Sequence, residues 1–189
     1  MASTVSSQAV AVIILNQSFE NPGGGAGTYA AATSWVGSSF TEISTEVPLS
    51  GGHLARYNGQ NDNTTGSQDL RVGFLANSVY LLTISIGDRA TNFLSGTVSF
   101  GLTAGGTNQG AFTQVTRAQV ADNTFQDFTY TLTTGAVAPT GNVGIKFSAD
   151  TTGRGVFDNV RLDASAIPEP STALCAVIGG LALLRRRRR

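Results

Sequence analysis

The stretch Tyr-Leu-Leu-Thr-Ile-Ser-Ile at residues 80–86 decides the fold, because large apolar side chains occupy every second position along it. These positions are Tyr80, Leu82, Ile84 and Ile86. Alternation with a period of two is typical of a β-strand that places one face on a core. The same pattern recurs over residues 97–103, 128–133 and 143–148, so the sequence predicts a protein built from strands.

Turn-forming residues separate these strands. Clusters of Gly, Asn, Asp and Pro lie at residues 87–88, 105–108, 121–123 and 139–142. Many short strands joined by polar turns favour an antiparallel β-sandwich of the jelly-roll kind over a parallel sheet, which would need helical crossovers. Residues 10–163 are therefore predicted to form one all-β domain.

The composition excludes some classes of partner and chemistry. Up to residue 168 the chain has seven basic and eleven acidic residues, and the other five basic residues are arginines at the end of the sequence. A body of this charge carries no basic patch for nucleic acid. The single cysteine, Cys175, lies in the apolar C-terminal run, so the body is expected to contain no disulfide.

The C-terminal residues combine a proline-flanked glutamate, a short apolar run and a cationic end. Pro168, Glu169 and Pro170 precede residues 171–184, an uncharged stretch of about 21 Å if helical at ~1.5 Å per residue. This predicts a short transmembrane helix. Five arginines follow this stretch: Arg185, Arg186, Arg187, Arg188 and Arg189. Transfer of arginine side chains through lipid is costly, so we expect them to stay on the cytoplasmic side and the body to lie outside the inner membrane.

This order of parts resembles the PEP-CTERM sorting signal of proteins exported by Gram-negative bacteria. The resemblance implies that residues 164–189 are a sorting signal and that a membrane-embedded exosortase recognises Pro168, Glu169 and Pro170. It also implies transient anchoring in the inner membrane, followed by delivery to the cell surface or the extracellular matrix. The two prolines keep Glu169 in an extended segment, which is the form that processing enzymes bind.

The N-terminal residues have the ending of a signal peptide without its beginning. Residues 1–9 contain no Lys or Arg and no apolar run, but Ser7, Gln8 and Ala9 provide small residues at the positions that a signal peptidase reads. We expect residues 1–9 to be the remnant of a signal peptide whose charged and apolar parts are encoded upstream. The alternative is that residues 10–15 are themselves a degenerate signal.

A second resemblance concerns the two ends of the body. The segments Asn-Gln-Ser-Phe-Glu at residues 16–20 and Phe-Asp-Asn-Val-Arg-Leu at residues 157–162, with Trp35 between them, resemble the ends of galactose-binding-like jelly rolls. Such domains occur as carbohydrate-binding modules. The resemblance implies that the first and last strands lie close together and that Glu20 and Asp158 bind a structural calcium ion.

The residues around Asp158 also suggest that it needs a partner. Asp158 has the same parity as Val156, Val160 and Leu162, so alternation predicts that its carboxyl group points toward the core if these residues do, and an unpaired charge is costly there. Three kinds of partner remain open: a calcium ion held with Glu20, a guanidinium group from Arg154 or Arg161, or backbone amides. The aromatic residues of the two ends, Phe19, Trp35 and Phe157, are predicted to be core residues.

Residues for catalysis are few. His53 is the single histidine, and the sequence has neither a Gly-x-Ser-x-Gly motif nor a histidine cluster for a metal. The sequence therefore predicts a body without catalytic activity and with a structural or adhesive role. The alternative is a carbohydrate-binding module for an extracellular polysaccharide, such as the exopolysaccharide of the cell itself, with Tyr29, Tyr57 and His53 as contact residues.

Overall fold

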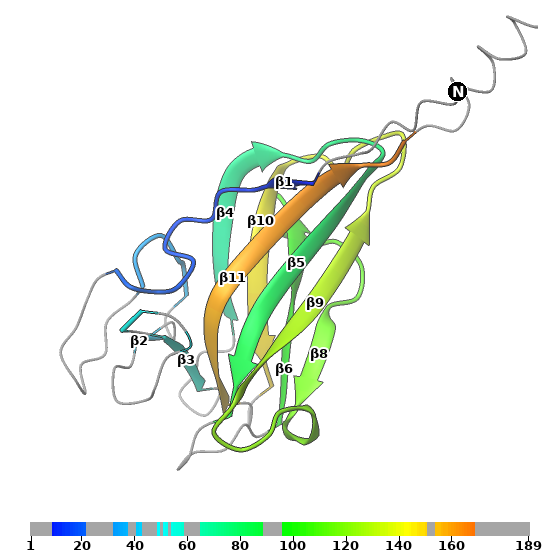
Figure 1. Cartoon of the computed structure of the whole chain (residues 1–189). Coiled ribbons are helices and arrows are strands. Elements are labelled where there is room, and N and C mark those ends of the chain that lie inside the picture. Colours follow the sequence, from blue (N-terminus) through cyan, green and yellow to red (C-terminus); the bar gives the residue numbers. More distant parts are fainter. Residues whose placement is uncertain are drawn as a thin grey trace, which may run out of the picture.

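The structure, a computed structural model, is all-β. It describes residues 9–21, 32–37, 41–42, 49, 51–52, 54–58, 65–88, 96–150 and 154–168. Among these residues, helix is confined to one 3-10 turn, Arg117–Gln119. The strands form two antiparallel sheets that pack face to face (Figure 1). This confirms the predicted antiparallel β-sandwich.

The first sheet, which we call sheet A, has the strand order β2-β3-β11-β5-β9, and β1 also pairs with β11. Its strands are β1 (Val10–Ala11), β2 (Thr41–Glu42), β3 (Ala55–Asn58), β5 (Ser78–Gly87), β9 (Phe125–Thr133) and β11 (Arg154–Ala166). The last strand thus lies inside the sheet, where it contacts both N-terminal and central strands. The pairing of β1 with β11 confirms that the two ends of the body lie close together.

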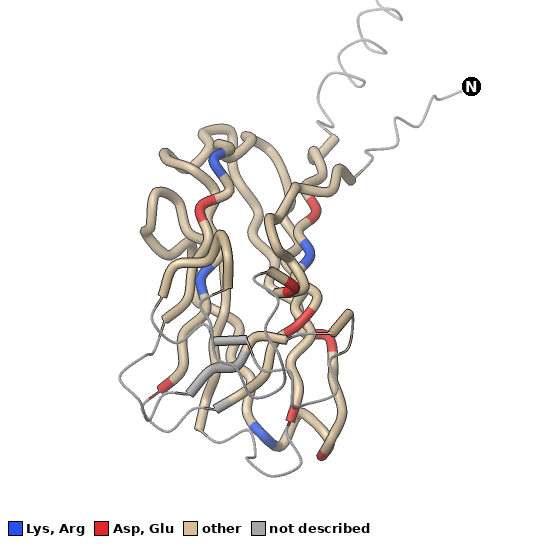
Figure 2. The backbone as a smooth tube through the Cα atoms, turned by 90° about the vertical axis from the view of Figure 1, so that its left-hand side faces the viewer, with Lys and Arg blue, Asp and Glu red and all other residues tan. Residues whose placement is uncertain are grey.

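The second sheet, sheet B, has the order β4-β10-β6-β7, with β8 also paired to β6. Its strands are β4 (Thr65–Gly73), β6 (Thr97–Ala104), β7 (Thr107–Asn108), β8 (Thr113–Thr116) and β10 (Asn142–Ala149). The alternating stretches of the sequence become β5, β6, β9 and β10; β5, β6 and β10 are inner strands, and β9 is an edge strand of sheet A. Figure 2 shows the two layers from the side, with acidic and basic positions interspersed along them.

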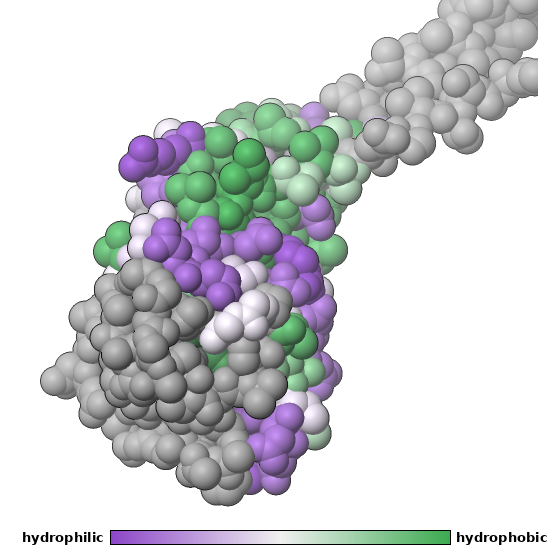
Figure 3. All heavy atoms as spheres, turned by 60° about the vertical axis from the view of Figure 1, so that its left-hand side comes forward, coloured by the Kyte–Doolittle hydropathy of each residue, from purple (hydrophilic) through white to green (hydrophobic). Residues whose placement is uncertain are grey.

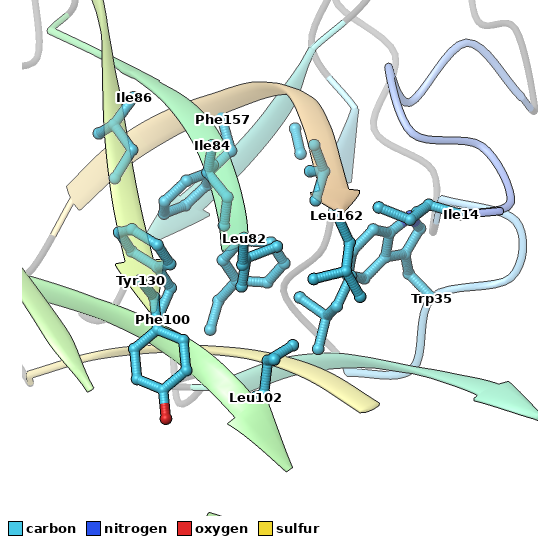
Figure 4. Close-up of a cluster of buried hydrophobic side chains, with 14 of the residues drawn as sticks. Ile14, Trp35, Leu82, Ile84, Ile86, Phe100, Leu102, Tyr130, Phe157 and Leu162 are labelled. Carbon is cyan, nitrogen blue, oxygen red and sulfur yellow. The ribbon is translucent and has the colours of Figure 1, made fainter. Parts of the chain in front are cut away.

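The core lies between the two sheets and is rich in aromatic and branched side chains (Figure 4). A row of ring contacts crosses it: Phe19 lies 5.3 Å from Trp35, Trp35 5.3 Å from Phe147, and Phe147 5.2 Å from Phe157. Such pairs stabilise beyond the area they bury. Phe19, Trp35 and Phe157 are all buried, which confirms their assignment to the core.

The segment that follows β1 is attached to both sheets. Val12 donates a backbone hydrogen bond to the Leu162 carbonyl of β11, at 2.7 Å. On the other side, the buried Gln68 amide of β4 accepts from the Leu15 amide at 3.0 Å and donates to the Leu15 carbonyl at 2.8 Å. This segment therefore connects the sheets at one edge of the sandwich.

Large apolar side chains remain exposed on part of the surface, among them Ile13, Val36 and Leu75. Figure 3 shows apolar atoms gathered at the end of the domain where β1 begins and β11 ends. Ile167 follows β11 directly and is 38% exposed. The apolar end of the domain therefore lies where the chain passes into the predicted sorting signal.

Candidate functional site

A β-bulge in β11 places the Asp158 carboxyl group on the outer face of sheet A. Asp158 pairs with Ser85 of β5, but the next pair is Arg161 with Thr83, so β11 has one extra residue at this point. Asn159, inside the bulge, has a φ of 51°, in the left-handed region. The prediction that Asp158 points to the core with Val160 and Leu162 is wrong, because the extra residue reverses the alternation.

Three polar side chains stand in one row across sheet A. Ser85 is paired with Asp158 of β11 on one side and with Asp127 of β9 on the other. Side chains of directly paired residues point to the same face and have Cβ atoms about 4.5–5.5 Å apart. Ser85 Oγ donates a hydrogen bond to Asp127 Oδ1 at 2.6 Å, and Arg161 Nη2 forms an ion pair with Asp127 Oδ2. We call Asp158, Ser85 and Asp127 the polar row, and Arg161 flanks it as the ion-pair partner of Asp127.

The polar row runs from the interior to solvent. Asp158 and Ser85 are 0% exposed, whereas the Asp127 side chain is 53% exposed. The backbone amide of Asn159 donates to Asp158 Oδ1 at 2.6 Å, so a backbone amide is one partner of this carboxyl group. Arg161, which the sequence offered as a partner of Asp158, pairs with Asp127 at the exposed end of the row.

A small apolar cluster lies next to the buried end of the row. Leu54 and Val156 are buried and pack together with Phe125. Gly87, the partner of Val156 in β5, makes this contact feasible: a Cβ atom on Gly87 would stand 2.8 Å from both the Phe125 ring and a Val156 methyl group. The apolar neighbours and the sheet together keep water away from this end of the row.

Glu20 is held by the segment that precedes β3. The Gly52 amide donates to both carboxylate oxygens of Glu20, at 3.1 and 3.0 Å. The chain near Glu20 also reaches the bulge, because the Val160 amide donates to the Gln17 carbonyl at 3.0 Å. Within the described part of the chain, no group of three or more His, Cys, Asp or Glu side chains could hold a metal ion. A calcium ion at Glu20 and Asp158 stays a prediction.

Several residues singled out from the sequence fall outside the described residues. These are Tyr29, His53, Glu169, Pro170 and the five C-terminal arginines, and the side chain of Tyr57 is likewise not described. Pro168 is exposed and comes two residues after the end of β11 at Ala166. No helix within the described ranges has the length and apolar character needed to span a membrane.

The sequence did not reveal the roles of Ser85 and Asp127. Ser85 occupies an outward position of a strand whose inward residues are apolar, which is the ordinary place for a serine. Its importance comes from burial and from its neighbours in β9 and β11, and strand pairing over such distances leaves no local signal. The feature that identifies Ser85 is its burial in a central strand, because a buried hydroxyl group requires a hydrogen-bonding partner. This burial is visible only in the structure.

Comparison with solved structures shows what the fold resembles. A cyclase from Fischerella sp. TAU, solved in complex with 4-(1H-indol-3-yl)butan-2-one, is similar with a TM-score of 0.66 and 20% identity, over 84% of this chain and 100% of that one. The CBM22-1 xylan-binding domain of Xyn10C from Paenibacillus barcinonensis is similar with a TM-score of 0.50 and 13% identity, over 80% of this chain and 94% of that domain. Both likenesses concern the fold. None of the curated proteins matches the chain.

Comparison with protein-family models corrects one expectation. Residues 10–163 match the HpiC1-like model, which is described as HpiC1 cyclase. The sequence predicted a body without catalytic activity, and this prediction is wrong, because the matching family is one of cyclases and the cyclase fold is shared. Since the match spans most of its 189 residues, the chain belongs to the HpiC1-like cyclase family.

Proposed function

We propose that the domain is an enzyme that closes a ring in an unsaturated organic substrate, with the Asp158 carboxyl group as the acid that starts the reaction. The observation that carries this proposal is the polar row, in which a fully buried carboxyl group is paired across strands with Ser85 and then Asp127. A carboxyl group held away from water in this way can serve as a general acid when it is protonated.

The proposed reaction is an isomerisation and needs no co-reactant. The Asp158 carboxyl group gives its proton to one carbon of a carbon–carbon double bond, whose electron pair forms the new C–H bond. The cation left at the other carbon is attacked by a π bond of the same molecule, which closes the ring. A proton then leaves the attacking group and returns to the protein, so that atoms and charge balance.

The rest of the polar row supports proton return. Ser85 Oγ is hydrogen-bonded to Asp127 Oδ1, and Asp127 is held by Arg161 at the surface. A hydroxyl group between two carboxyl groups can accept a proton from one and donate to the other. The row thus connects the buried Asp158 carboxyl group with the solvent-exposed Asp127 carboxylate. Asp127 in turn forms an ion pair with the Arg161 guanidinium group.

The substrate class follows from the related cyclase. That protein was solved with an indole-bearing ketone, and an indole ring is an electron-rich π system of the kind that attacks a carbocation. We propose that the substrate of this domain likewise joins an aromatic ring to an alkene. The apolar cluster of Leu54, Val156 and Phe125 beside Asp158 favours a substrate of this character.

The first experiment measures binding and turnover separately. Calorimetric titration with 4-(1H-indol-3-yl)butan-2-one reports binding, and chromatography with mass detection reports products of unchanged mass from indole-bearing alkenes. We expect Asp158→Asn to abolish product formation while melting temperature and binding persist. Asp163→Asn, a change on the same strand outside the row, is the matched control and should keep full activity. Turnover that survives Asp158→Asn would contradict the assignment.

We also propose that the protein is exported and that its C-terminal residues are a PEP-CTERM signal, read by an exosortase at Pro168, Glu169 and Pro170. The exposed position of Pro168, two residues after the end of β11, supports this proposal, because an exposed segment next to a folded domain is available for processing. Mass spectrometry of the protein from cells with and without exosortase tests it. We expect loss of the residues after this motif in the first case and their retention in the second.

A second candidate function is recognition of an extracellular polysaccharide. It is supported by the fold shared with a xylan-binding domain and by a polar hollow on the outer face of sheet B. This function would use the face of the sandwich opposite the polar row, so both functions are compatible in one domain.

A further inference from the structure

The outer face of sheet B contains a hollow of about 420 Å³. Small-molecule sites commonly have volumes of about 300–1,000 Å³. The hollow lies over the centre of the sheet, where β10 has β4 on one side and β6 on the other. Its lining consists of charged, amide, hydroxyl and glycine residues, without any large apolar side chain.

The floor of the hollow is a glycine between two polar side chains. Gly144 of β10 pairs with Asp69 of β4 and with Thr103 of β6. A Cβ atom at Gly144 would stand 2.4 Å from Thr103 Oγ1 and 3.3 Å from the Gln68 carbonyl oxygen. Because Gly144 has no side chain, the buried Thr103 hydroxyl group takes the space that a Cβ atom would need, and it lies across Gly144 from Asp69.

The Asp69 carboxylate is fixed at one side of the hollow. Its Oδ1 accepts a hydrogen bond from the Arg71 amide at 2.7 Å, and its Oδ2 accepts one from Asn142 Nδ2 at 3.1 Å. These two bonds and the nearby Arg71 guanidinium group lower the pKa of Asp69. The carboxylate is exposed, and each of its oxygens has a second lone pair for a ligand hydroxyl group.

Lys146 provides a cation at the same hollow. It is the single lysine of the sequence, lies two residues after Gly144 on β10, and is half-buried. The ion pairs among the described residues involve Arg117 and Arg161, and none of them uses the Lys146 ammonium group. A half-buried cation of this kind is available to a ligand anion.

We propose that this hollow binds an acidic sugar, a hexuronate unit of an extracellular polysaccharide. Lys146 binds the carboxylate of the sugar, and Asp69 accepts hydrogen bonds from neighbouring hydroxyl groups. The inference rests on the second candidate function and names its site and ligand class. The polar lining disfavours a lipid, and a sugar, unlike a phosphate, brings hydroxyl donors for the Asp69 carboxylate.

The test is a binding titration of the full chain with a trigalacturonate and, as the matched neutral probe, a galactotriose. We expect binding of the acidic probe and weaker binding of the neutral one. Lys146→Gln should weaken binding of the acidic probe by about tenfold or more, because charge-assisted hydrogen bonds are the strong ones. Lys146→Arg should restore much of this binding. Asp69→Asn should weaken binding of both probes, while Asp163→Asn and Asp158→Asn leave it unchanged.

The possible outcomes distinguish an error in the proposed binding site from an error in the proposed polysaccharide-binding function. If trigalacturonate binds and neither Lys146→Gln nor Asp69→Asn weakens it, the polysaccharide function stands and the hollow is the wrong site. If the neutral probe binds as tightly as the acidic one, the proposed role of Lys146 is overturned. If neither probe binds, both the inference and the second candidate function fail.

Discussion

Asn159 determines where the Asp158 carboxyl group points, because its left-handed backbone accommodates the extra residue of the bulge. Asparagine and glycine adopt this conformation readily, whereas β-branched residues do so at a cost. A change at Asn159 therefore tests the bulge without touching the carboxyl group itself.

We predict that Asn159→Val lowers the free energy of unfolding by about 1–3 kcal/mol, the usual cost of holding a side chain in a disfavoured backbone region. Asn159→Gly should change it little. Urea denaturation of both variants gives the comparison. Equal stabilities for the two would show that the bulge does not depend on this backbone conformation.

A second residue-scale prediction concerns the titration of Asp69. The amide of Arg71 and the side chain of Asn142 lower its pKa in the folded protein. The stabilisation from the ionised carboxylate is therefore present above the ordinary pKa of about 3.9 and is lost as pH falls through the lowered value. Carbon-detected NMR should show the folded midpoint below the ordinary one, and Asn142→Ala should raise it. An unchanged midpoint in Asn142→Ala would argue against this hydrogen bond.

At the scale of elements, Gln68 connects β4 to the segment after β1. Its amide bonds to both backbone groups of Leu15 and also donates to the Ser34 carbonyl at 3.3 Å. We predict that Gln68→Ala lowers the free energy of unfolding by about 2–3 kcal/mol, since it leaves partly buried backbone groups without partners. Gln126→Ala, at an exposed position of β9, is the control.

Hydrogen exchange provides the local readout for this prediction. In Gln68→Ala the Leu15 amide should exchange much faster, because its acceptor is Gln68 Oε1. Amides at the centre of β5 should keep their relative order of protection. A Leu15 amide that remains as protected as in the unchanged protein would contradict the role of Gln68.

The strands that could be predicted from the sequence are those with uninterrupted alternation. Residues 80–86 and 143–148 fall within β5 and β10, because each has one face on the core along its whole length. The last strand, β11, was placed correctly, but the facing of Asp158 was not. One extra residue in a strand reverses which face of the sheet the residues N-terminal to it point to. The bulge is recognised from the pairing of β11 with β5, which the local sequence does not reveal.

The candidate site was predictable only in part for the same reason. Asp158 was singled out from its local sequence, but Ser85 and Asp127 belong to strands far away along the chain. Their meeting depends on the order β11-β5-β9, which is set by the packing of the whole sandwich. Local patterns specify strands, whereas the polar row is a property of their arrangement.

At the scale of the whole molecule, the two faces of the sandwich are chemically different. The outer face of sheet A has a buried acid beside an apolar cluster, and the outer face of sheet B has an open hollow with fixed charges. The proposed acid and the proposed sugar site therefore lie on different faces of the domain. Variants of the two faces should therefore act independently, since sites this far apart without shared partners usually do.

The central claim is that Asp158 protonates a carbon of the substrate, and the most direct test is the mass of the cyclised product formed in D₂O. The exchangeable carboxyl proton is then deuterium. We predict a product heavier by one carbon-bound deuterium with the unchanged protein and with Asp163→Asn, and no product with Asp158→Asn. A cyclised product without carbon-bound deuterium, or one formed equally well by Asp158→Asn, would contradict the account.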